Sequence, residues 1–418
     1  MRNWIIVCSI LLLISIDCCA AAHGGSNPAV CSKCHTVSLT GGHKELNCAA
    51  CHGDAVDIKD PAVLSSSNGC GRCHAGAEHI LHQAMATRSA EQEFCRRSWG
   101  MKDSKFFSVN CNGCHVSSCR DCHGSGHDVT IPTAATCYKC HNGYFVGWDY
   151  AGRAPREDSV RYQRGGRDNE QYYLKMLPDV HQQAGMECAD CHSMGSLQRG
   201  QRGSRSCRDC HDIDKSIIEH SIPEHLNKME CVSCHAAWAA QEYATFYLHT
   251  ANSDNRRFFR VKKDNEQYIK SSYLRRQNLP PLGLNKCGLV APIRPQFIAY
   301  YSAMENNRPN GRENQLLLAQ WKAFSPHTIR RGSAMCDSCH ADARRFILEP
   351  LAKRIYRPDL DGLQLVSFWR SDGQTVVNGS FYPQWRFKQL SAKSNRYRRK
   401  YVQKWQYFLK KDAPSCAH

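Results

Sequence analysis

The feature that most constrains this 418-residue chain is a C-x-x-C-H motif that occurs ten times. These motifs use twenty of the 26 cysteines, and a histidine directly follows each second cysteine. The motifs are Cys31/Cys34/His35, Cys48/Cys51/His52, Cys70/Cys73/His74, Cys111/Cys114/His115, Cys119/Cys122/His123, Cys137/Cys140/His141, Cys188/Cys191/His192, Cys207/Cys210/His211, Cys231/Cys234/His235 and Cys336/Cys339/His340. This pattern is typical of covalent c-type haem attachment. Two thiols bind the two vinyl groups of one porphyrin, and the following imidazole is the proximal iron ligand.

Zinc sites and disulfides are the alternatives for paired cysteines. A zinc ribbon uses such pairs two at a time and gives no reason for a histidine after every pair. A redox-active disulfide explains one C-x-x-C pair but not ten. Outside the motifs, Cys95 and Cys287 are either a disulfide, in an oxidising compartment, or two isolated buried thiols. We therefore expect ten covalently attached haems c as the cofactors.

Eleven histidines remain outside the motifs, close to the number that a second histidine ligand on every iron requires. Without the terminal His418, the candidate distal ligands are His23, His43, His79, His82, His127, His181, His220, His225, His249 and His327. Some of them come shortly before a motif, but such a histidine often serves a neighbouring haem, so no pairs are assigned. Methionine is the alternative ligand, at Met85, Met186 or Met229. The counts predict bis-histidine ligation for most haems.

The N-terminal residues have the pattern of an export signal. Trp4–Ile16 is an apolar or small run of 13 residues, too short to cross a bilayer and suited to the core of a signal peptide. Small residues at Ala20–Ala22 indicate cleavage of residues 1–22. Alternatively, Cys18 or Cys19 carries lipid, as in bacterial lipoproteins. Both interpretations predict an exported protein in the periplasm or at the outer membrane, and no later apolar run is long enough for a transmembrane helix.

The uneven motif spacing predicts the domain organisation. The expected parts are a signal peptide in 1–22, a six-haem module in 23–141, a linker in 142–187, a three-haem module in 188–235 and a C-terminal region with one haem in 236–418. Only 42% of the residues are hydrophobic, so haem is expected to supply much of the buried surface. The fold class expected is a multihaem cytochrome c with short α-helices and coil wrapped around a haem array, and a small mixed α+β C-terminal part.

Three elements are expected in the C-terminal part. The apolar positions of Glu313–Phe324 favour a helix. Ser371–Gln374 contains an Asp-Gly pair and is predicted to be a hairpin turn between Leu363–Trp369 and Thr375–Val377. A second helix is indicated near the chain end by aromatic residues at helical spacing: Tyr397, Tyr401, Trp405 and Phe408. We expect this stripe to pack on the haem-bearing part of the chain, in preference to a membrane.

The formal net charge is +17, and residues 341–418 hold 16 Lys or Arg against six Asp or Glu. Each haem brings two propionates, so part of the basic excess is expected to pair with them. The rest is either a solvated face or a docking surface for an acidic partner or anionic lipid. Export and haem density argue against nucleic acid as a partner.

Ten such motifs after a signal peptide resemble the bacterial multihaem c-type cytochromes, and the dense early block resembles their class III members, which have closely packed bis-histidine haems. The segments Val290–Phe297 (VAPIRPQF) and Phe324–Gly332 (FSPHTIRRG) resemble the multihaem lipoproteins of selenite and tellurite reduction operons. These resemblances imply a periplasmic or outer-membrane electron carrier, lipid-anchored in the second case. The chain lacks the C-x-x-C-K motif of pentahaem nitrite reductases, and its 100-residue gap before the last motif departs from evenly spaced decahaem conduits.

Three functions are compatible with the sequence. The first is an electron carrier in extracellular or oxyanion respiration, with redox proteins as partners, a possible outer-membrane complex and no catalytic residue. The second is a reductase of a small oxyanion such as selenite, tellurite, tetrathionate or nitrite at one open haem, with His340 as its proximal ligand. The third is a subunit of a cytochrome filament. We expect the carrier, and we expect loss of His327 to open or alter one haem.

Overall fold

The structure is a computed structural model that describes most of the chain between residues 39 and 411. The described residues are 39, 41–47, 50–51, 68–71, 73–101, 104–110, 115–124, 127–141, 149–151, 162–168, 171–176, 179–200, 204–240, 246–249, 261–263, 268–271, 276–301, 304–305, 308–309, 315–350, 371 and 373–411. They fall into two compact units. Unit 1 takes its described residues from 1–89, 113–140 and 187–205, and unit 2 takes its own from 90–112, 141–186 and 206–418.

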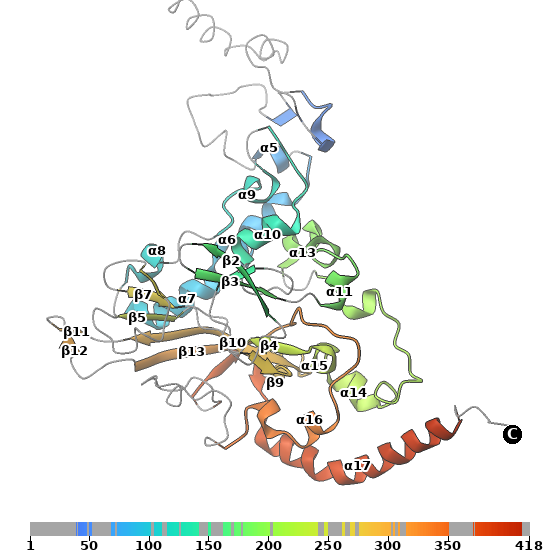
Figure 1. Ribbon diagram of the computed structural model, residues 1–418. Coiled ribbons are helices and arrows are strands. Elements are labelled where there is room, and N and C mark those ends of the chain that lie inside the picture. The colour runs from blue at the N-terminus through green and yellow to red at the C-terminus, as the bar shows by residue number, and fades with distance from the viewer. Residues whose placement is uncertain are drawn as a thin grey trace, which may run out of the picture. The chain divides into compact units, whose positions relative to one another are not determined.

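Unit 1 consists of short helices, as the sequence predicts for a haem-bearing region (Figure 1). In order they are η2 (Gly41–His43), α5 (Asn68–Gly71), η3 (Ala77–His82), α6 (Ala84–Thr87), α9 (Arg120–His123), α10 (Ala134–His141), α12 (Cys188–Cys191) and α13 (Met194–Arg199). The longest of these has eight residues, which is too short to be stable without tertiary contacts. Gly124 ends α9 with a φ of 96°, where an added Cβ would lie 2.6 Å from the Asp128 carbonyl oxygen.

Unit 2 combines further short helices with one long one. Its helices are α7 (Ser89–Arg97), η4 (Trp99–Met101), α8 (Phe106–Asn110), α11 (Val180–Gln183), η7 (Cys207–Asp209), α14 (Pro223–Lys228), α15 (Val232–His235), α16 (Asp337–His340), η9 (Ala343–Phe346) and α17 (Gln384–Lys411). Residues predicted as one three-haem module therefore lie in both units, with the motif in α12 in unit 1 and those at η7 and α15 in unit 2. The module boundaries stay a prediction.

A five-stranded mixed sheet forms the centre of unit 2. Its strand order is β14 (Thr375–Val377), β13 (Gln315–Ala323), β10 (Val290–Tyr301), β9 (Leu282–Asn285) and β15 (Gly379–Phe381). β10 pairs antiparallel with β13 and β9, and β13 pairs parallel with β14. A register shift separates Pro295 from Phe297, because a proline cannot donate to the ladder and is tolerated at a bulge. β10 and β13 are the two long neighbouring arrows in Figure 1.

Four smaller sheets complete the described strands. They are β1 (Asp149–Ala151) with β3 (Gln171–Met176) and β2 (Tyr162–Asp168); β4 (Trp238–Ala240) with β8 (Arg276–Asn278); β5 (Phe246–His249) with β7 (Tyr268–Ser271) and β6 (Val261–Lys263); and β11 (Met304–Glu305) with β12 (Arg308–Pro309). The segment 142–187, predicted as a linker, thus contains β1, β2, β3 and α11.

The predicted helix over Glu313–Phe324 is wrong, because its described part forms strand β13. The strand packs its apolar residues against neighbours on both sides, and Ala319, Gln320 and Trp321 in its centre are all buried. A strand buried on both faces reads as a continuous apolar run, and periodicity alone cannot separate such a run from a buried helix. Paired with β10, the segment satisfies its backbone groups in the ladder instead.

The predicted hairpin is described only in part. Thr375–Val377 is strand β14, but it pairs in parallel with β13. Leu363–Trp369, the expected partner strand, lies outside the described residues. The predicted C-terminal helix is confirmed as α17.

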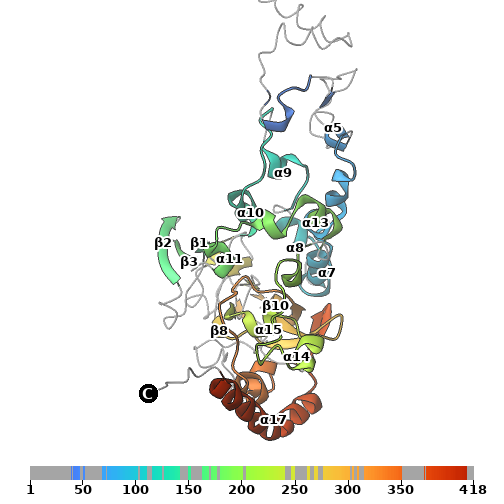
Figure 2. The ribbon, with the colours of Figure 1, turned by 90° about the vertical axis from the view of Figure 1, so that its right-hand side faces the viewer.

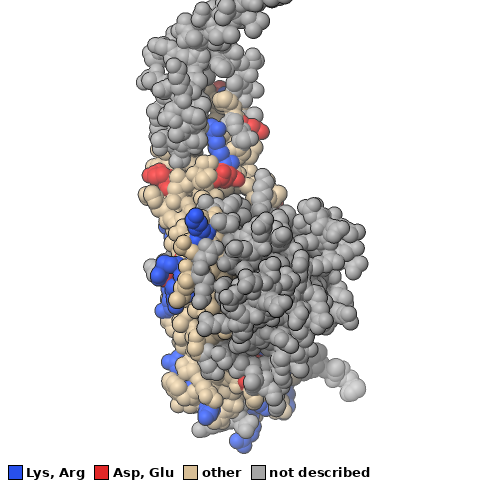
Figure 3. All heavy atoms as spheres, turned by 90° about the vertical axis from the view of Figure 1, so that its left-hand side faces the viewer, with Lys and Arg blue, Asp and Glu red and all other residues tan. Residues whose placement is uncertain are grey.

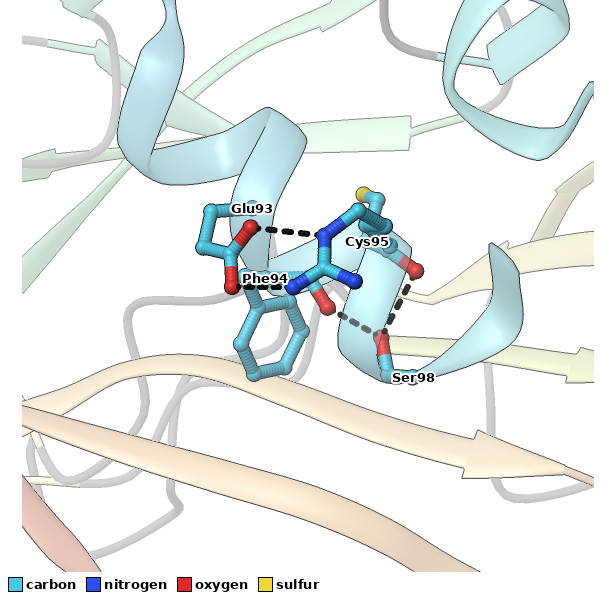
Figure 4. Close-up of polar contacts among 5 residues, drawn as sticks. Glu93, Phe94, Cys95 and Ser98 are labelled. Atoms are coloured by element: carbon cyan, nitrogen blue, oxygen red, sulfur yellow. Dashed lines mark hydrogen bonds and ion pairs between the residues drawn. The ribbon is translucent and has the colours of Figure 1, made fainter. Parts of the chain in front are cut away.

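Aromatic side chains build a buried cluster in unit 2. Phe94, Trp99 and Phe106 are each at most 3% exposed, and Trp99 stacks on Phe106 with ring centroids 4.6 Å apart. Ser98 supports this corner, because its buried hydroxyl donates to the Phe94 carbonyl at 2.7 Å (Figure 4). Cys95 is buried and Cys287 is exposed, and no disulfide joins these two described residues. The prediction of a buried isolated thiol therefore fits Cys95 but is wrong for Cys287.

Helix α17 is the most basic element of unit 2. It contains ten Lys or Arg and no Asp or Glu. One face packs on the rest of unit 2: Tyr401 donates to Glu219 at 2.5 Å, and Arg398 pairs with Asp337 at 3.0 Å. The other faces are exposed, and Lys and Arg gather at the lower end of Figure 3, the level at which Figure 1 places α17. Packing of the aromatic stripe agrees with the prediction for Tyr401.

Among the described helices, none combines the length and hydropathy that a membrane crossing needs.

Candidate haem sites

Six of the described C-x-x-C-H motifs are closed by the same backbone hydrogen bond, in which the histidine amide donates to the carbonyl of the first cysteine. The bond joins His74 to Cys70 (2.9 Å), His123 to Cys119 (3.0 Å), His192 to Cys188 (2.8 Å), His211 to Cys207 (2.9 Å), His235 to Cys231 (3.0 Å) and His340 to Cys336 (2.9 Å). Residues three and four positions apart share one face of a helical turn. The two thiols and the imidazole of a motif therefore project to the same side.

Imidazole rings from different parts of the chain face one another. In the part of the chain that the structure describes, four proximal histidines each have a second imidazole 6.0 to 6.2 Å away between ring centroids. The pairs are His43 with His74 in unit 1, and His181 with His211, His220 with His235 and His225 with His340 in unit 2. Angles of 43° to 69° between the planes show that the rings do not stack.

This separation fits an iron atom between the two rings. A metal–imidazole bond is about 2 Å long, and the ring centroid lies roughly 1 Å beyond the bonded nitrogen. Two imidazoles on opposite sides of one metal therefore have centroids about 6 Å apart. The donor set at each pair, two imidazoles with two thiols beside one of them, is the set that haem c requires.

Several of these imidazoles are oriented through Nδ1. The Nδ1 atom faces a backbone carbonyl oxygen at 2.9 Å in His235, 3.1 Å in His123 and 3.2 Å in His220. In His192 the partner is the Ser204 hydroxyl at 2.8 Å. A carbonyl can only accept, so it fixes the proton on Nδ1 and leaves the lone pair of Nε2 for a metal. Some of the groups that orient these imidazoles lie far from the motif in sequence. The C-x-x-C-H pattern therefore does not predict them.

Burial keeps three of the imidazoles in the neutral form that binds metals. Desolvation lowers the pKa of His192, His225 and His340 below the usual value. His340 contributes further to the lowering in His225, because two neighbouring imidazolium ions repel each other. A neutral imidazole has a free lone pair, so these sites need not lose a proton to bind iron near neutral pH.

Thiols of different motifs lie in contact with one another. In unit 1 the Cys119 thiol is hydrogen-bonded to Cys70, and that of Cys137 to Cys188. In unit 2 the hydrogen bond between Cys207 and Cys231 raises the pKa of the first thiol and lowers that of the second. In the haem-bound chain these sulfurs would be thioethers. Contact between them would place the attachment points of separate haems next to each other.

The sheet of unit 2 holds the motif at α15 through main-chain hydrogen bonds. Glu230 donates from its amide to the Val290 carbonyl at the start of β10 (2.9 Å), and the Ser233 hydroxyl donates to the same oxygen at 2.8 Å. Figure 2 shows α15 beside β10. On the other side, the Arg330 amide donates to the His235 carbonyl at 3.1 Å, and the Ala334 amide donates to Cys234 at 2.9 Å.

The same segment, residues 328–334, also reaches the helix that carries His181. Val180 donates from its amide to the Ile329 carbonyl at 3.1 Å, and Asp179 accepts from the Ile329 amide. Asp179 also caps α11, because its side chain accepts from the His181 and Gln182 amides at 3.0 Å. One extended segment thus positions His181, a predicted distal ligand, and His235, the predicted proximal ligand of a different site.

The remaining predicted site residues divide into three groups. His79, His82, His127 and His327 are exposed, and His249 lies on β5. Cys140 and His141 lie in α10, Cys51 is exposed, and Cys73, Cys122, Cys191, Cys210, Cys234 and Cys339 lie within the motifs described above. His115 is described, whereas Cys18, Cys19, His23, Cys31, Cys34, His35, Cys48, His52, Cys111 and Cys114 lie outside the described residues.

Comparison with known proteins agrees with this geometry in one segment. The class III cytochrome C family matches residues 157–257, the segment that contains His181, His220 and His225 and the motifs of α12, η7 and α15. No match is found among curated proteins or among solved structures. The family match supports a multihaem c-type cytochrome that carries covalently bound haem c and transfers electrons with redox proteins as partners. Cytochromes of this class are typically exported.

Proposed function

We propose that this chain is a decahaem electron carrier whose haems are nearly all six-coordinate with two histidine ligands, exported to the periplasm or the outer membrane. The observation that carries the proposal is the set of four imidazole pairs at 6.0 to 6.2 Å. An iron closed on both sides by protein ligands offers no position to a substrate, which suits electron transfer and not substrate reduction.

In this proposal the cysteines hold each porphyrin covalently, and the paired histidines ligate its iron from both sides. When bound, haem c supplies reversible one-electron exchange at its iron. Main-chain carbonyls keep the protons of His123, His220 and His235 on Nδ1 and so keep Nε2 directed at the metal. The thiol contacts would place the attachment points of different haems next to each other, which supports a short path for electrons within each unit.

The motif with His340 is the candidate for an open, catalytic iron in the reductase hypothesis. His225 faces His340 with ring centroids 6.2 Å apart, so this site has a second imidazole in place. His225 precedes His340 by 115 residues, and the stretch between them contains three of the five strands of the central sheet. This geometry favours the carrier over an oxyanion reductase at His340.

The experiment compares His225→Ala with Glu224→Ala, a change at the neighbouring residue of α14, as the matched control. We expect His225→Ala to convert one haem to a high-spin or ligand-exchangeable form in electron paramagnetic resonance and magnetic circular dichroism spectra, with the other haems unchanged. Glu224 is exposed and carries no imidazole, so its replacement is expected to leave every haem low-spin. A wild-type protein with a large high-spin fraction and fast turnover of a small oxyanion would refute the carrier.

The haem number and the export signal have separate tests. Intact-mass analysis of the mature protein is expected to show ten haem additions, and eight or fewer would contradict the proposal.

A lipid on Cys18 or Cys19 predicts partition into the detergent phase and retention on membranes after a salt wash, because acyl anchors are insensitive to salt. A mature N-terminus at His23 would exclude the anchor.

A further inference from the structure

We propose that Arg345 raises the reduction potentials of the two haems attached at Cys231/Cys234 and Cys336/Cys339, an inference that rests on the proposed electron-transfer function. These are the ninth and tenth haem sites in chain order. The residue belongs to neither motif, and its sequence position gives it no evident role.

Arg345 connects the two sites. It lies in η9, five residues after the proximal His340, and only 1% of its surface is exposed. Its Nη2 atom donates at 2.5 Å to the carbonyl oxygen of Ser233. Ser233 lies between the two cysteines of the ninth motif and is itself fully buried. A side chain that follows the tenth motif therefore reaches the backbone of the ninth.

The guanidinium has little around it to balance its charge. Its Nε and Nη1 atoms are buried and have no hydrogen-bond partner among the described residues. The thiols of Cys339 and Cys234 are the strongest favourable neighbours, ahead of Asp342. Arg330 is a second cation nearby, and its Nε atom is also buried without a partner.

The thiols do not balance this charge near neutral pH, because burial raises the pKa of Cys234 to about 11 and also raises that of Cys339. Once both cysteines are thioethers, their sulfurs cannot become negative, so the guanidinium then faces two neutral attachment points. Burial lowers the pKa of Arg345, but a guanidinium stays protonated in proteins. An uncompensated buried charge is costly unless another group offsets it.

An electron added to a neighbouring haem can offset the buried positive charge of Arg345. Reduction of a ferric haem lowers the positive charge of the site by one, and a nearby cation stabilises the reduced state most where water is excluded. The two haems beside Arg345 are therefore easier to reduce than they would be without it. The direction is the same if a haem propionate meets the free N–H groups, because removal of the guanidinium would leave that carboxylate's negative charge uncompensated.

The test is a spectroelectrochemical titration of the holoprotein carrying Arg345→Gln. We expect two of the midpoint potentials to shift to more negative values and the others to stay where they are. Arg344→Gln is the matched control, since it removes the same charge from the adjacent, exposed residue and is expected to leave the titration unchanged. Arg345→Lys keeps the charge, so its midpoint potentials are expected to stay close to those of the wild type.

Haem content and low-spin spectra are measured for each variant, so that assembly and potential are separated. A titration of Arg345→Gln that superimposes on the wild type, with haem content intact, overturns the inference and leaves the proposed function standing. An equal shift in Arg345→Lys and Arg345→Gln also overturns it, because a packing role would then explain both. If Arg345→Gln does not assemble, Arg330→Gln replaces it, and a smaller shift in the same direction is required. High-spin wild-type protein, by contrast, counts against the proposed function itself.

Discussion

Unit 1 and unit 2 both carry C-x-x-C-H motifs, but they differ in how much of their own side-chain surface they bury. Among the described residues of unit 1, the buried hydrophobic residues are Ala77, Ile80 and Ala134. Unit 2 buries twenty, including Trp321, Phe106, Leu282 and Ile293. Side chains fill the interior of unit 2, whereas the short helices of unit 1 have little apolar surface of their own to pack on.

This difference indicates two ways to hold a haem site. In unit 2, residues 328–334 and the start of β10 attach the ninth motif to a sheet by main-chain hydrogen bonds. In unit 1, local turns do this work: Asp121 accepts from the Ser117 and Ser118 amides in the three-residue link between His115 and Cys119. The stability of unit 1 should therefore depend on haem more than that of unit 2.

The largest effect is expected from haem removal. In apoprotein made without haem attachment, the amides near Ile80 and Ala134 should exchange with solvent as in an unfolded chain, because the helices there are too short to persist alone. Amides of β10 and β13 should stay protected by the core around Ile293 and Trp321. Hydrogen exchange with mass spectrometry measures both regions in one sample. Equal loss of protection in the two units would remove the distinction.

The next effect concerns the side-chain core of unit 2. Trp321 is fully buried and lies edge to face with Phe381 at 5.5 Å between centroids. Trp321→Ala is expected to lower the free energy of unfolding of unit 2 by about 3–5 kcal/mol. Trp385→Ala is the control, since this tryptophan is 58% exposed and surface changes stay within about 0.5 kcal/mol. Urea unfolding followed by far-ultraviolet circular dichroism distinguishes them, and similar losses would contradict the assignment of the core.

A smaller effect is expected in unit 1 from Asp121→Ala. Burial alone would raise the pKa of Asp121, but hydrogen bonds from the Ser117 and Ser118 amides and the Ser117 hydroxyl outweigh it and lower the pKa. Loss of such a capping carboxylate costs about 1 kcal/mol, and less here because the side chain is exposed. The folded-state pKa is depressed, so the contribution is present above the ordinary Asp pKa and disappears as pH falls through the depressed one.

A pH series of unfolding experiments therefore compares wild type with Asp121→Ala. The two proteins should differ near neutral pH and converge in acid. A constant difference at every pH would show that the carboxylate charge is not what holds this link.

The smallest effect is expected from Arg96→Ala on the surface of α7. The hydrogen bond from Arg96, 2.8 Å from both carboxylate oxygens, lowers the pKa of Glu93 (Figure 4). Both groups are exposed, so solvent screens the pair and no change in melting temperature is expected. The Glu93 carboxyl should then titrate at its ordinary pKa, which is higher than in the wild type, as carbon-13 resonances can show. An unchanged titration would mean that the pair does not persist in solution.

The sequence predicts the attachment chemistry more fully than the fold. The geometry of a motif is local, because Cys231, Cys234 and His235 lie within one helical turn and need no contact from elsewhere in the chain to do so. The aromatic spacing from Tyr397 to Phe408 likewise predicts α17 correctly. The apolar run in Leu316–Leu318 fails as a helix signal, since only the pairing with β10 decides its conformation.

The pairing of imidazoles could not be predicted from spacing. His225 and His340 are 115 residues apart, and their approach depends on the sheet to which the intervening chain contributes three strands. Nor does any local pattern distinguish the buried Arg345 from the exposed Arg344 next to it. Both facts follow from tertiary packing, which one sequence without its fold does not contain.

The enclosure of the ninth motif has a consequence for biogenesis. Ser233 and Ala236 are fully buried, and the carbonyls of Cys234 and His235 are occupied by residues 330–334. A maturation enzyme that joins haem to both thiols must reach this loop before those residues close over it. We therefore expect the ninth haem to be attached before residues 330–334 pack against the motif. Attachment that proceeds from the N-terminus as the chain emerges satisfies this order, and the sheet then seals the finished site.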